Sequence, residues 1–308
     1  LRRKSQEFPD KVFFSSFQDP NLQYLCRGSL SDYAACQCKE DEGEVACINA
    51  QFVDTDVFFN LNAHYKSLQK VTFHGNNFQD LPSTSLFGSV SHSRLHTLNI
   101  SANYIVNLNS NALKGLPNLR VLDLSNNEIV LKESDVDFLT HTPRLTEVLD
   151  LSYNFLQSVP FELPCPFPSL TSLDLRQNFL KNLVVNGSCL TKVRSVDLSR
   201  NQFYSLTSSF RHLASSAQPD TYVLRNPFHC DCKSNDYVTW VRSTDVIRDK
   251  HTLVCDRASP RNYVGARLVE VPLHKLDCSV NLFAMSARHS SLATAALVLL
   301  ISILLLLF

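Results

Sequence analysis

The chain has 308 residues, and its 29 Lys and Arg are balanced by 29 Asp and Glu, so its formal net charge at pH 7 is zero. This balance excludes a polybasic nucleic-acid binder that depends on counterion release, and a hydrophobic fraction of 44% excludes a chain that is disordered throughout. With only 7 Gly, the chain also lacks the phosphate-binding motifs GxGxxG and GxxxxGKS/T.

Residues 1–25 form a polar N-terminal segment, and the first of two groups of cysteines follows it. The groups are Cys26, Cys36, Cys38 and Cys47 near one end, and Cys230, Cys232, Cys255 and Cys278 near the other. Each group contains a C-x-C, whose two side chains point to opposite sides of an extended strand. We therefore expect the two cysteines of each C-x-C to have different partners within their group. Zinc sites favour a C-x₂₋₄-C spacing, so the pattern favours disulfides and an oxidising compartment.

Residues 68–226 repeat the pattern LxxLxLxxNxL with a period of about 24 residues, in six clear copies and a degenerate seventh. Each copy supplies a short strand whose leucine positions point inward, and no copy can bury them alone. The pattern therefore predicts an α/β fold, a leucine-rich-repeat solenoid with a right-handed superhelix and a parallel sheet on its concave side.

An asparagine ends each copy of the pattern, where the chain must turn sharply after the strand. Its side chain offers a carbonyl acceptor and two amide donors, so it can bond backbone groups of its own repeat and of a neighbouring one. We call these residues the ladder asparagines, and we predict a structural role for Asn76, Asn103, Asn127, Asn154, Asn178, Asn201 and Asn226.

A solenoid exposes its core at both ends and needs caps there. The two cysteine groups lie where caps belong. We predict an N-terminal cap over residues 26–67, with a strand at 45–47, and a C-terminal cap over residues 227–278, with an apolar-faced helix at 237–241.

The end of the sequence is apolar. After an expected stalk at residues 279–291, residues 292–308 read LATAALVLLISILLLLF and carry no charge. As a helix they would span about 25 Å, slightly less than a bilayer core. Small residues and a polar spacer precede them, as in a GPI-attachment signal. The sequence thus predicts either a transmembrane helix or a GPI signal, and in both cases a location on the extracellular face of the plasma membrane.

Residues 26–278 resemble the extracellular leucine-rich-repeat proteins that have cysteine-rich N- and C-terminal caps. In that family the first N-cap cysteine pairs with the third and the second with the fourth. The C-cap motif NPWxCDC of the family reads NPFHCDC here, with Phe228 in place of the tryptophan. The resemblance implies the bridges Cys26–Cys38, Cys36–Cys47, Cys230–Cys255 and Cys232–Cys278.

One member of this family, a type I membrane glycoprotein linked to inhibition of Wnt signalling, is similar to this chain over residues 222–232 and 236–241 and in the membrane segment that follows. The resemblance implies that this chain binds an extracellular protein ligand or receptor and modulates signalling, with Wnt inhibition as one example, or mediates adhesion. The alternative is a matrix-type structural interaction protein that is shed from cells.

Residues between the last two apolar positions of each strand are expected to point out of the concave face. Four successive repeats carry an aspartate there, and we call Asp123, Asp150, Asp174 and Asp197 the acidic row. The row can meet a basic patch on a partner. The alternative is that aspartate is simply common at this position of the repeat and is solvated.

Two N-x-S sequons, at Asn99 and Asn186, are predicted glycosylation sites. Asn186 lies in a connecting segment and is the better acceptor, whereas a glycan at Asn99 would cover the first half of the concave face. Cys165 and Cys189 lie in successive connections and are expected to pair, with two free buried thiols as the alternative.

Motifs of enzyme chemistry are missing from the sequence. It contains no HExxH or GxSxG, and its ten histidines are scattered. We therefore expect no catalytic residues, no cofactor, no metal site and no nucleic-acid partner.

Overall fold

The computed structural model describes residues 25–26, 36–65, 67–109, 111–131 and 144–278. The predicted stalk, the apolar segment 292–308 and residues 1–24 lie outside these ranges. Within the described ranges, none of the helices combines the length and the apolar character needed to cross a bilayer.

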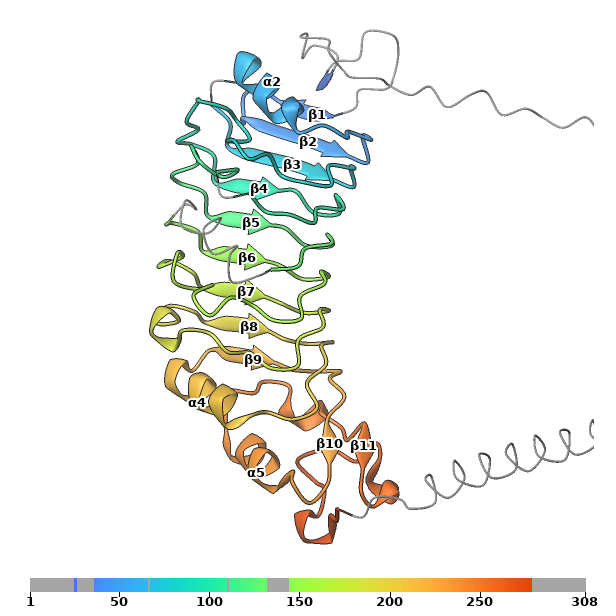
Figure 1. The fold of residues 1–308 in the computed structure, drawn as a ribbon. Helices are drawn as coiled ribbons and strands as arrows, with labels where there is room; N and C mark the ends of the chain where they lie inside the picture. Colours follow the sequence, from blue (N-terminus) through green and yellow to red (C-terminus); the bar gives the residue numbers. More distant parts are fainter. Residues whose placement is uncertain (1–24, 27–35, 66, 110, 132–143, 279–308) are drawn as a thin grey trace, which may run out of the picture.

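Nine strands form one sheet in which the spatial order equals the order along the chain (Figure 1). The first pair is antiparallel, and every later pair is parallel. This arrangement confirms the predicted parallel solenoid sheet and adds one antiparallel edge strand. The strands are β1 (Gln37–Lys39), β2 (Glu44–Ile48), β3 (Lys70–His74), β4 (Thr97–Asn99), β5 (Val121–Asp123), β6 (Val148–Asp150), β7 (Ser172–Asp174), β8 (Ser195–Asp197) and β9 (Asp220–Tyr222).

The register of the sheet aligns equivalent positions of the repeats. Leu122 pairs with Leu98 on one side and with Leu149 on the other, and all three side chains are buried. The residues on either side of them are half-buried and face away from the core. Alternation along each strand therefore separates a continuous leucine core from a half-buried face that carries most of the polar side chains.

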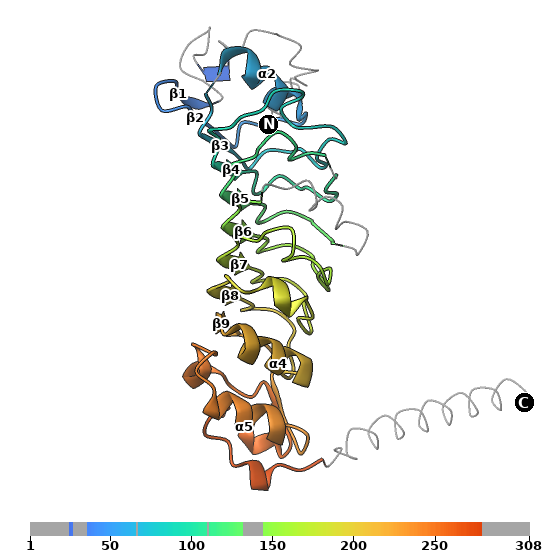
Figure 2. The ribbon, with the colours of Figure 1, turned by 90° about the vertical axis from the view of Figure 1, so that its left-hand side faces the viewer.

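Turns and short helices, rather than one helix per repeat, return the chain between strands (Figure 2). The described residues thus have the parallel strands of the predicted solenoid, with short helices in some of the connections between them. One cause of the turns is proline, which removes backbone donors from the connection that contains Pro160, Pro164, Pro166 and Pro168. The helices described are α2 (Asp56–His64), α4 (Ser208–Ala217), α5 (Asn235–Ser243), η2 (Gly187–Cys189), η3 (Lys250–Thr252), η4 (Arg261–Tyr263) and η5 (Leu273–Lys275).

The two ends of the core are closed differently. At the N-terminal end the ring of Phe58, from α2, packs against Phe73 and Phe87 with centroids 4.5 and 5.7 Å apart. At the C-terminal end β10 (His229–Cys230) pairs with β11 (Arg257–Ala258). Phe228 is buried there and stacks on Tyr237 of α5, with centroids 6.2 Å apart, so the phenylalanine of the NPFHCDC motif still fills an apolar site.

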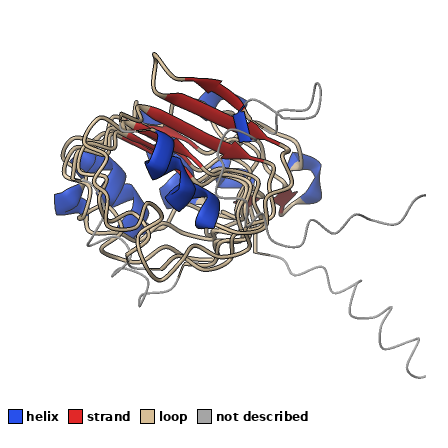
Figure 3. Ribbon diagram, turned by 90° about the horizontal axis from the view of Figure 1, so that it is seen from above, coloured by secondary structure: helices blue, strands red, loops and turns tan. Residues whose placement is uncertain are grey.

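Seen along its long axis, the molecule has the strands on one side and the turns and helices around the remaining sides (Figure 3). Among the described residues, no helix lies over the outer face of the sheet. The face of the sheet and the turns that follow its strands are thus the surfaces that the repeats present to a partner.

Candidate binding surface

The ladder asparagines hold the turns that follow strands β3 to β9, and all seven are buried. The side-chain amide of Asn127 donates to the carbonyl oxygens of Ile100, in the preceding repeat, and of Leu124, in its own repeat, at 3.1 and 3.0 Å. Its carbonyl accepts the backbone N–H groups of Asn103 and Ile105 at 2.8 and 3.0 Å. Each such side chain thereby satisfies backbone groups that would otherwise be buried without partners.

The sheet brings the acidic row together. Asp150 pairs in register with Asp123 on one side and Asp174 on the other, and Asp174 pairs with Asp197. All four side chains are half-buried. Each carboxylate also accepts the backbone N–H of the residue two positions later, at 2.8 to 3.0 Å. The aspartates therefore have a structural role in the turn in addition to the negative charge that they place on the face.

Asp174 has the most perturbed environment of the row. Burial raises the pKa of its carboxyl to about 6, and the charges of Asp150 and Asp197 act in the same direction. The backbone N–H and the guanidinium of Arg176 oppose this rise, and the guanidinium lies 3.2 Å from the carboxylate. Mild acidification is therefore expected to remove negative charge from the middle of the row.

Arginines near the row are mostly engaged elsewhere. Arg120 pairs with Glu147 at 3.0 Å, and Arg200 donates to the side chain of Gln177 at 3.4 Å. Arg176 differs from these two arginines because its guanidinium contacts Asp174, a member of the row. The row therefore keeps a net negative charge along most of its length.

The sequon at Asn99 is part of the concave face. Its side-chain amide donates to Asp123 at 2.6 Å, and its carbonyl accepts the backbone N–H and the hydroxyl of Ser101. Asn99 thus extends the line of the acidic row by one repeat, and a glycan on its nitrogen would lie beside Asp123 on this face.

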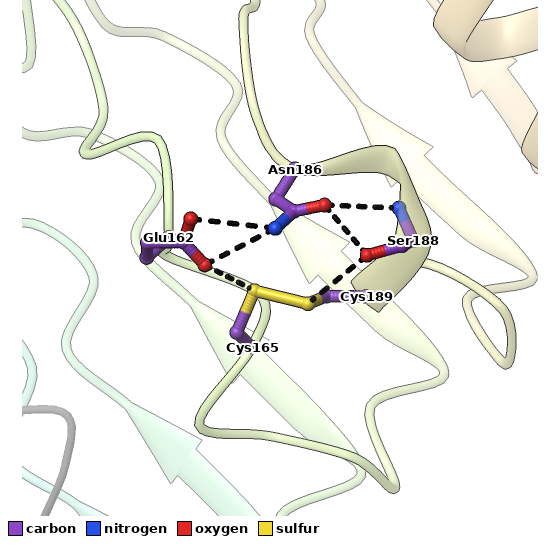
Figure 4. Close-up of a disulfide and its surroundings, with 5 residues drawn as sticks. All are labelled: Glu162, Cys165, Asn186, Ser188 and Cys189. Atoms are coloured by element: carbon purple, nitrogen blue, oxygen red, sulfur yellow. Dashed lines mark hydrogen bonds between the residues drawn. A yellow bond between two sulfur atoms is a disulfide. The ribbon is translucent and has the colours of Figure 1, made fainter.

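The sequon at Asn186 lies on the opposite side, at the start of η2 (Figure 4). Its carbonyl accepts from the backbone N–H and the hydroxyl of Ser188, and its amide donates to the carboxylate of Glu162 at 3.2 and 3.3 Å. The disulfide Cys165–Cys189 lies beside this group.

All ten cysteines are paired, as Cys26–Cys38, Cys36–Cys47, Cys165–Cys189, Cys230–Cys255 and Cys232–Cys278. The connectivity of the caps is the one that the family resemblance implies. Glu162 lies with Cys165 and Cys189 in a group whose ligand-type atoms are within 4.8 Å of one another. Because both sulfurs are in a disulfide, they offer no thiolate to a metal.

One histidine that the sequence does not single out is buried. His92 is 3% exposed, its Nε2 lies 2.5 Å from the side-chain oxygen of Asn62, and its ring packs edge-on against Phe87. Burial lowers the pKa of this imidazole. Its contacts are those of a packed structural residue.

The leucine and asparagine pattern of the repeats does not predict a second set of exposed side chains. Large apolar groups occur beside the ladder asparagines, outside the core and outside the sheet face. They include Tyr104, Tyr153, Phe155, Phe179 and Tyr204, which are 41% to 57% exposed. They can be recognised in the sequence as aromatic residues next to or near a ladder asparagine, at positions that the leucine pattern leaves unconstrained.

Known proteins share this architecture. The family model "Leucine rich repeat" matches residues 93–136. Trophoblast glycoprotein of Macaca fascicularis is 25% identical over an alignment 288 residues long, which covers 80% of this chain and 67% of that protein. Toll-like receptor 6 of Mus musculus is 26% identical over 94% of this chain, but over only 35% of its own length.

The solved structure of human trophoblast glycoprotein, also named Wnt-activated inhibitory factor 1, has a TM-score of 0.61 and is 24% identical. The match covers 81% of this chain and 99% of that structure. At this identity the likeness shows the fold. The relatives are named as a glycoprotein and a receptor, and neither is named as an enzyme.

Proposed function

We propose that this chain, which is a leucine-rich-repeat protein with disulfide-bonded caps at both ends, is a cell-surface glycoprotein that binds an extracellular protein partner. Five disulfides support an oxidising location. Relatives that are named as a glycoprotein and a receptor support a place outside the cell or at the plasma membrane.

The observation that carries the binding proposal is the acidic row on an uncovered sheet. Its carboxylates are held in register by strand pairing and by backbone N–H groups, so a partner need not order them. A line of fixed negative charge suits a partner with a complementary basic patch. We therefore place the partner on the concave face.

The finer proposal is that binding inhibits Wnt signalling. Its support is the printed name of the structurally similar human protein, Wnt-activated inhibitory factor 1. The test expresses the full chain in cells that carry a Wnt-responsive reporter, and we expect a lower reporter signal. An unchanged signal at equal surface expression rejects the Wnt proposal and leaves modulation of another pathway, or adhesion, to be tested.

The same cells test the acidic row. A triple variant with Asp123→Asn, Asp150→Asn and Asp174→Asn keeps the side-chain oxygens that accept backbone N–H groups and removes three charges. The control removes three exposed acids outside the row, with Asp41→Asn, Asp245→Asn and Glu270→Gln. We expect capture of a partner, identified by cross-linking and mass spectrometry, to fail only for the row variant. Equal capture by both variants contradicts the placement.

The glycan proposal concerns both sequons. Asn99 lies on strand β4 of the sheet, where its amide donates to Asp123, whereas Asn186 lies in a connecting segment, where its amide donates to Glu162. We therefore expect higher occupancy at Asn186, in its connecting segment. Peptide mass spectrometry after glycosidase treatment measures the mass shift at each asparagine, and a modified Asn99 beside an unmodified Asn186 would contradict this expectation.

Attachment through residues 292–308 is also a proposal. Surface labelling of intact cells before and after phospholipase treatment distinguishes its two forms. Release of the label indicates a GPI anchor, and retention indicates a transmembrane helix. Absence of the label from intact cells, with the chain found only in the medium, would favour the shed matrix-type protein.

A further inference from the structure

The turns after the strands form a second surface, along the edge to which the strand arrows point in Figure 1. Around each ladder asparagine the exposure alternates. In the repeat of Asn178, for example, Gln177, Phe179 and Lys181 are exposed, whereas Asn178 and Leu180 are buried. The residues just before, just after and three after a ladder asparagine therefore share one face, which we call the flank.

The flank is aromatic in three successive repeats, those of Asn154, Asn178 and Asn201. Tyr153, Phe155, Phe179 and Tyr204 are 41%, 46%, 41% and 49% exposed. The rings of Phe155 and Phe179 stack with centroids 5.9 Å apart and planes 18° apart, in neighbouring repeats. Single exposed apolar residues are ordinary, but a contiguous exposed set on one face is typical of an interaction site.

Side-chain contacts join these residues from one repeat to the next. The guanidinium of Arg176 lies over the ring of Tyr153, 6.0 Å from its centroid. Farther along the stack, Arg200 donates to Gln177, and the ring of Tyr204 lies 5.6 Å from that of His229. Each step from the repeat of Asn154 to that of Asn226 therefore has at least one contact between side chains of neighbouring repeats.

The backbone beneath these side chains is fixed. The N–H of Phe179 donates to the carbonyl of Leu156 at 2.9 Å, and the N–H of His229 donates to the carbonyl of Tyr204 at 2.8 Å. A surface held in this way loses little conformational freedom on binding.

Charge distinguishes this part of the flank from the part before it. In the last four repeats the flank positions include Lys181, Arg200 and Arg225 and no carboxylate. In the three preceding repeats the same positions include no Lys or Arg and one acid, Glu128. We name the set Tyr153, Phe155, Phe179, Lys181, Arg200, Tyr204 and Arg225 the flank ridge.

Backbone conformation adds a second observation. The residue before the ladder asparagine has a positive φ, which is 54° at Asn126 but also 55° at Tyr153 and 57° at Arg200. Asparagine tolerates this region better than most residues with side chains. The backbone conformation of the turn therefore does not require the large side chains of Tyr153 and Arg200 at this position.

We propose that the flank ridge is a docking surface for an acidic segment of a partner protein, in which carboxylates alternate with apolar side chains. Guanidinium groups bond carboxylates in a bidentate geometry, and arginine and aromatic residues supply a large share of the binding energy at protein interfaces. The ridge lies on a different face from the acidic row and has the opposite charge. It therefore adds a second surface to the proposed binding function.

The test measures binding of short synthetic peptides to the purified full chain by biolayer interferometry. One peptide alternates Asp with Leu, a second alternates Lys with Leu, and a third alternates Asp with Ser. We expect the Asp–Leu peptide to bind more tightly than the Asp–Ser peptide. Two double variants test the ridge, one with Phe155→Ser and Phe179→Ser and the other with Arg200→Glu and Arg225→Glu. Each should raise the dissociation constant of the Asp–Leu peptide by about tenfold or more.

The matched control changes the equivalent flank of the earlier repeats, with Tyr104→Ser and Val130→Ser, and should bind the Asp–Leu peptide as the unchanged chain does. Failure of the Asp–Leu peptide to bind, or unchanged binding by both ridge variants, overturns the proposal. A third outcome also overturns the proposal: a heparin fragment binds the unchanged chain but not the ridge variants, and the Asp–Leu peptide does not bind. The site would then recognise a polysaccharide. Binding of the Lys–Leu peptide reports on the acidic row, so failure of the ridge and failure of the proposed function are distinguishable.

Discussion

The acidic row and the flank ridge arise from the same repeats, yet their side chains are placed for different reasons. Every aspartate of the row accepts a backbone N–H of its own turn. Folding alone therefore gives one reason for an aspartate at each of these positions. The ridge aromatics stack on one another and on a guanidinium while remaining more than 40% exposed. A regular polar pattern is thus weaker evidence of binding than an exposed aromatic pattern that the fold does not require.

The ladder asparagines support both surfaces, and their loss should have the largest effect. Asn127→Leu would leave backbone groups of two repeats buried without partners and should cost about 3 kcal/mol of unfolding free energy or more. Thermal denaturation of the variant beside Glu128→Gln, at an exposed neighbour, measures the loss. An unchanged melting temperature for Asn127→Leu would contradict the ladder role.

Asp174→Asn should instead stabilise the protein at neutral pH, by about 1–3 kcal/mol. The pKa of Asp174 is raised to about 6 in the folded state, so the stability that this carboxyl contributes is present below its unfolded pKa of 3.8 and is lost as pH rises through about 6. The asparagine carries no charge and keeps an oxygen for the N–H of Arg176.

Chemical denaturation of the Asp174→Asn variant and the unchanged chain at about pH 7 and about pH 4 tests this sign. The difference should be present at the higher pH and shrink at the lower one. Asp41→Asn, at an exposed turn, is the control for removal of one charge. A variant that is less stable than the unchanged chain at neutral pH would refute the unfavourable environment of Asp174.

Within the row, the structural and electrostatic roles can be separated at Asp150. Its carboxylate accepts the N–H of Ser152 at 2.8 Å. Asp150→Ala should therefore cost about 1 kcal/mol, whereas Asp150→Asn retains an acceptor and should cost much less. Equal losses for the two variants, measured by denaturation, would mean that the charge and not the hydrogen bond matters for folding.

The ridge should contribute least to folding. Phe179→Ala is expected to cost less than about 1.5 kcal/mol, mainly through loss of the stack with Phe155. Its buried neighbour provides the comparison, since Leu180→Ala removes a core side chain and should cost about 2–5 kcal/mol. Similar losses at both positions would show that Phe179 is a core residue and would weaken the case for a docking surface.

The repeat pattern predicts much of the fold because its leucine and asparagine positions obey strong constraints. Leu98, Leu122 and Leu149 must point inward, and the asparagines must meet unpaired backbone groups, so strand positions follow directly from the sequence. The connections obey weaker constraints, since turns and helices can both span them. This is why the sequence does not predict which of the described connections contain a helix, such as α4 or η2.

The candidate surfaces were less predictable. The acidic row follows from strand alternation, but the hydrogen bond from each aspartate to the residue two positions later depends on the shape of the turn. The ridge depends on the alternation of exposure around a ladder asparagine, as at Gln177, Phe179 and Leu180, and the leucine pattern says nothing about it. Pairing of Phe155 with Phe179 further requires the spacing of neighbouring repeats.

The central claim is that one rigid scaffold presents two separable binding faces of opposite charge. Dissociation constants of the Lys–Leu and Asp–Leu peptides, measured on the full chain, on the triple row variant and on the Phe155→Ser and Phe179→Ser variant, test it most directly. We expect the row variant to lose binding of the Lys–Leu peptide only, and the ridge variant to lose binding of the Asp–Leu peptide only. Loss of both peptides by either variant, or of neither peptide by both, would contradict it.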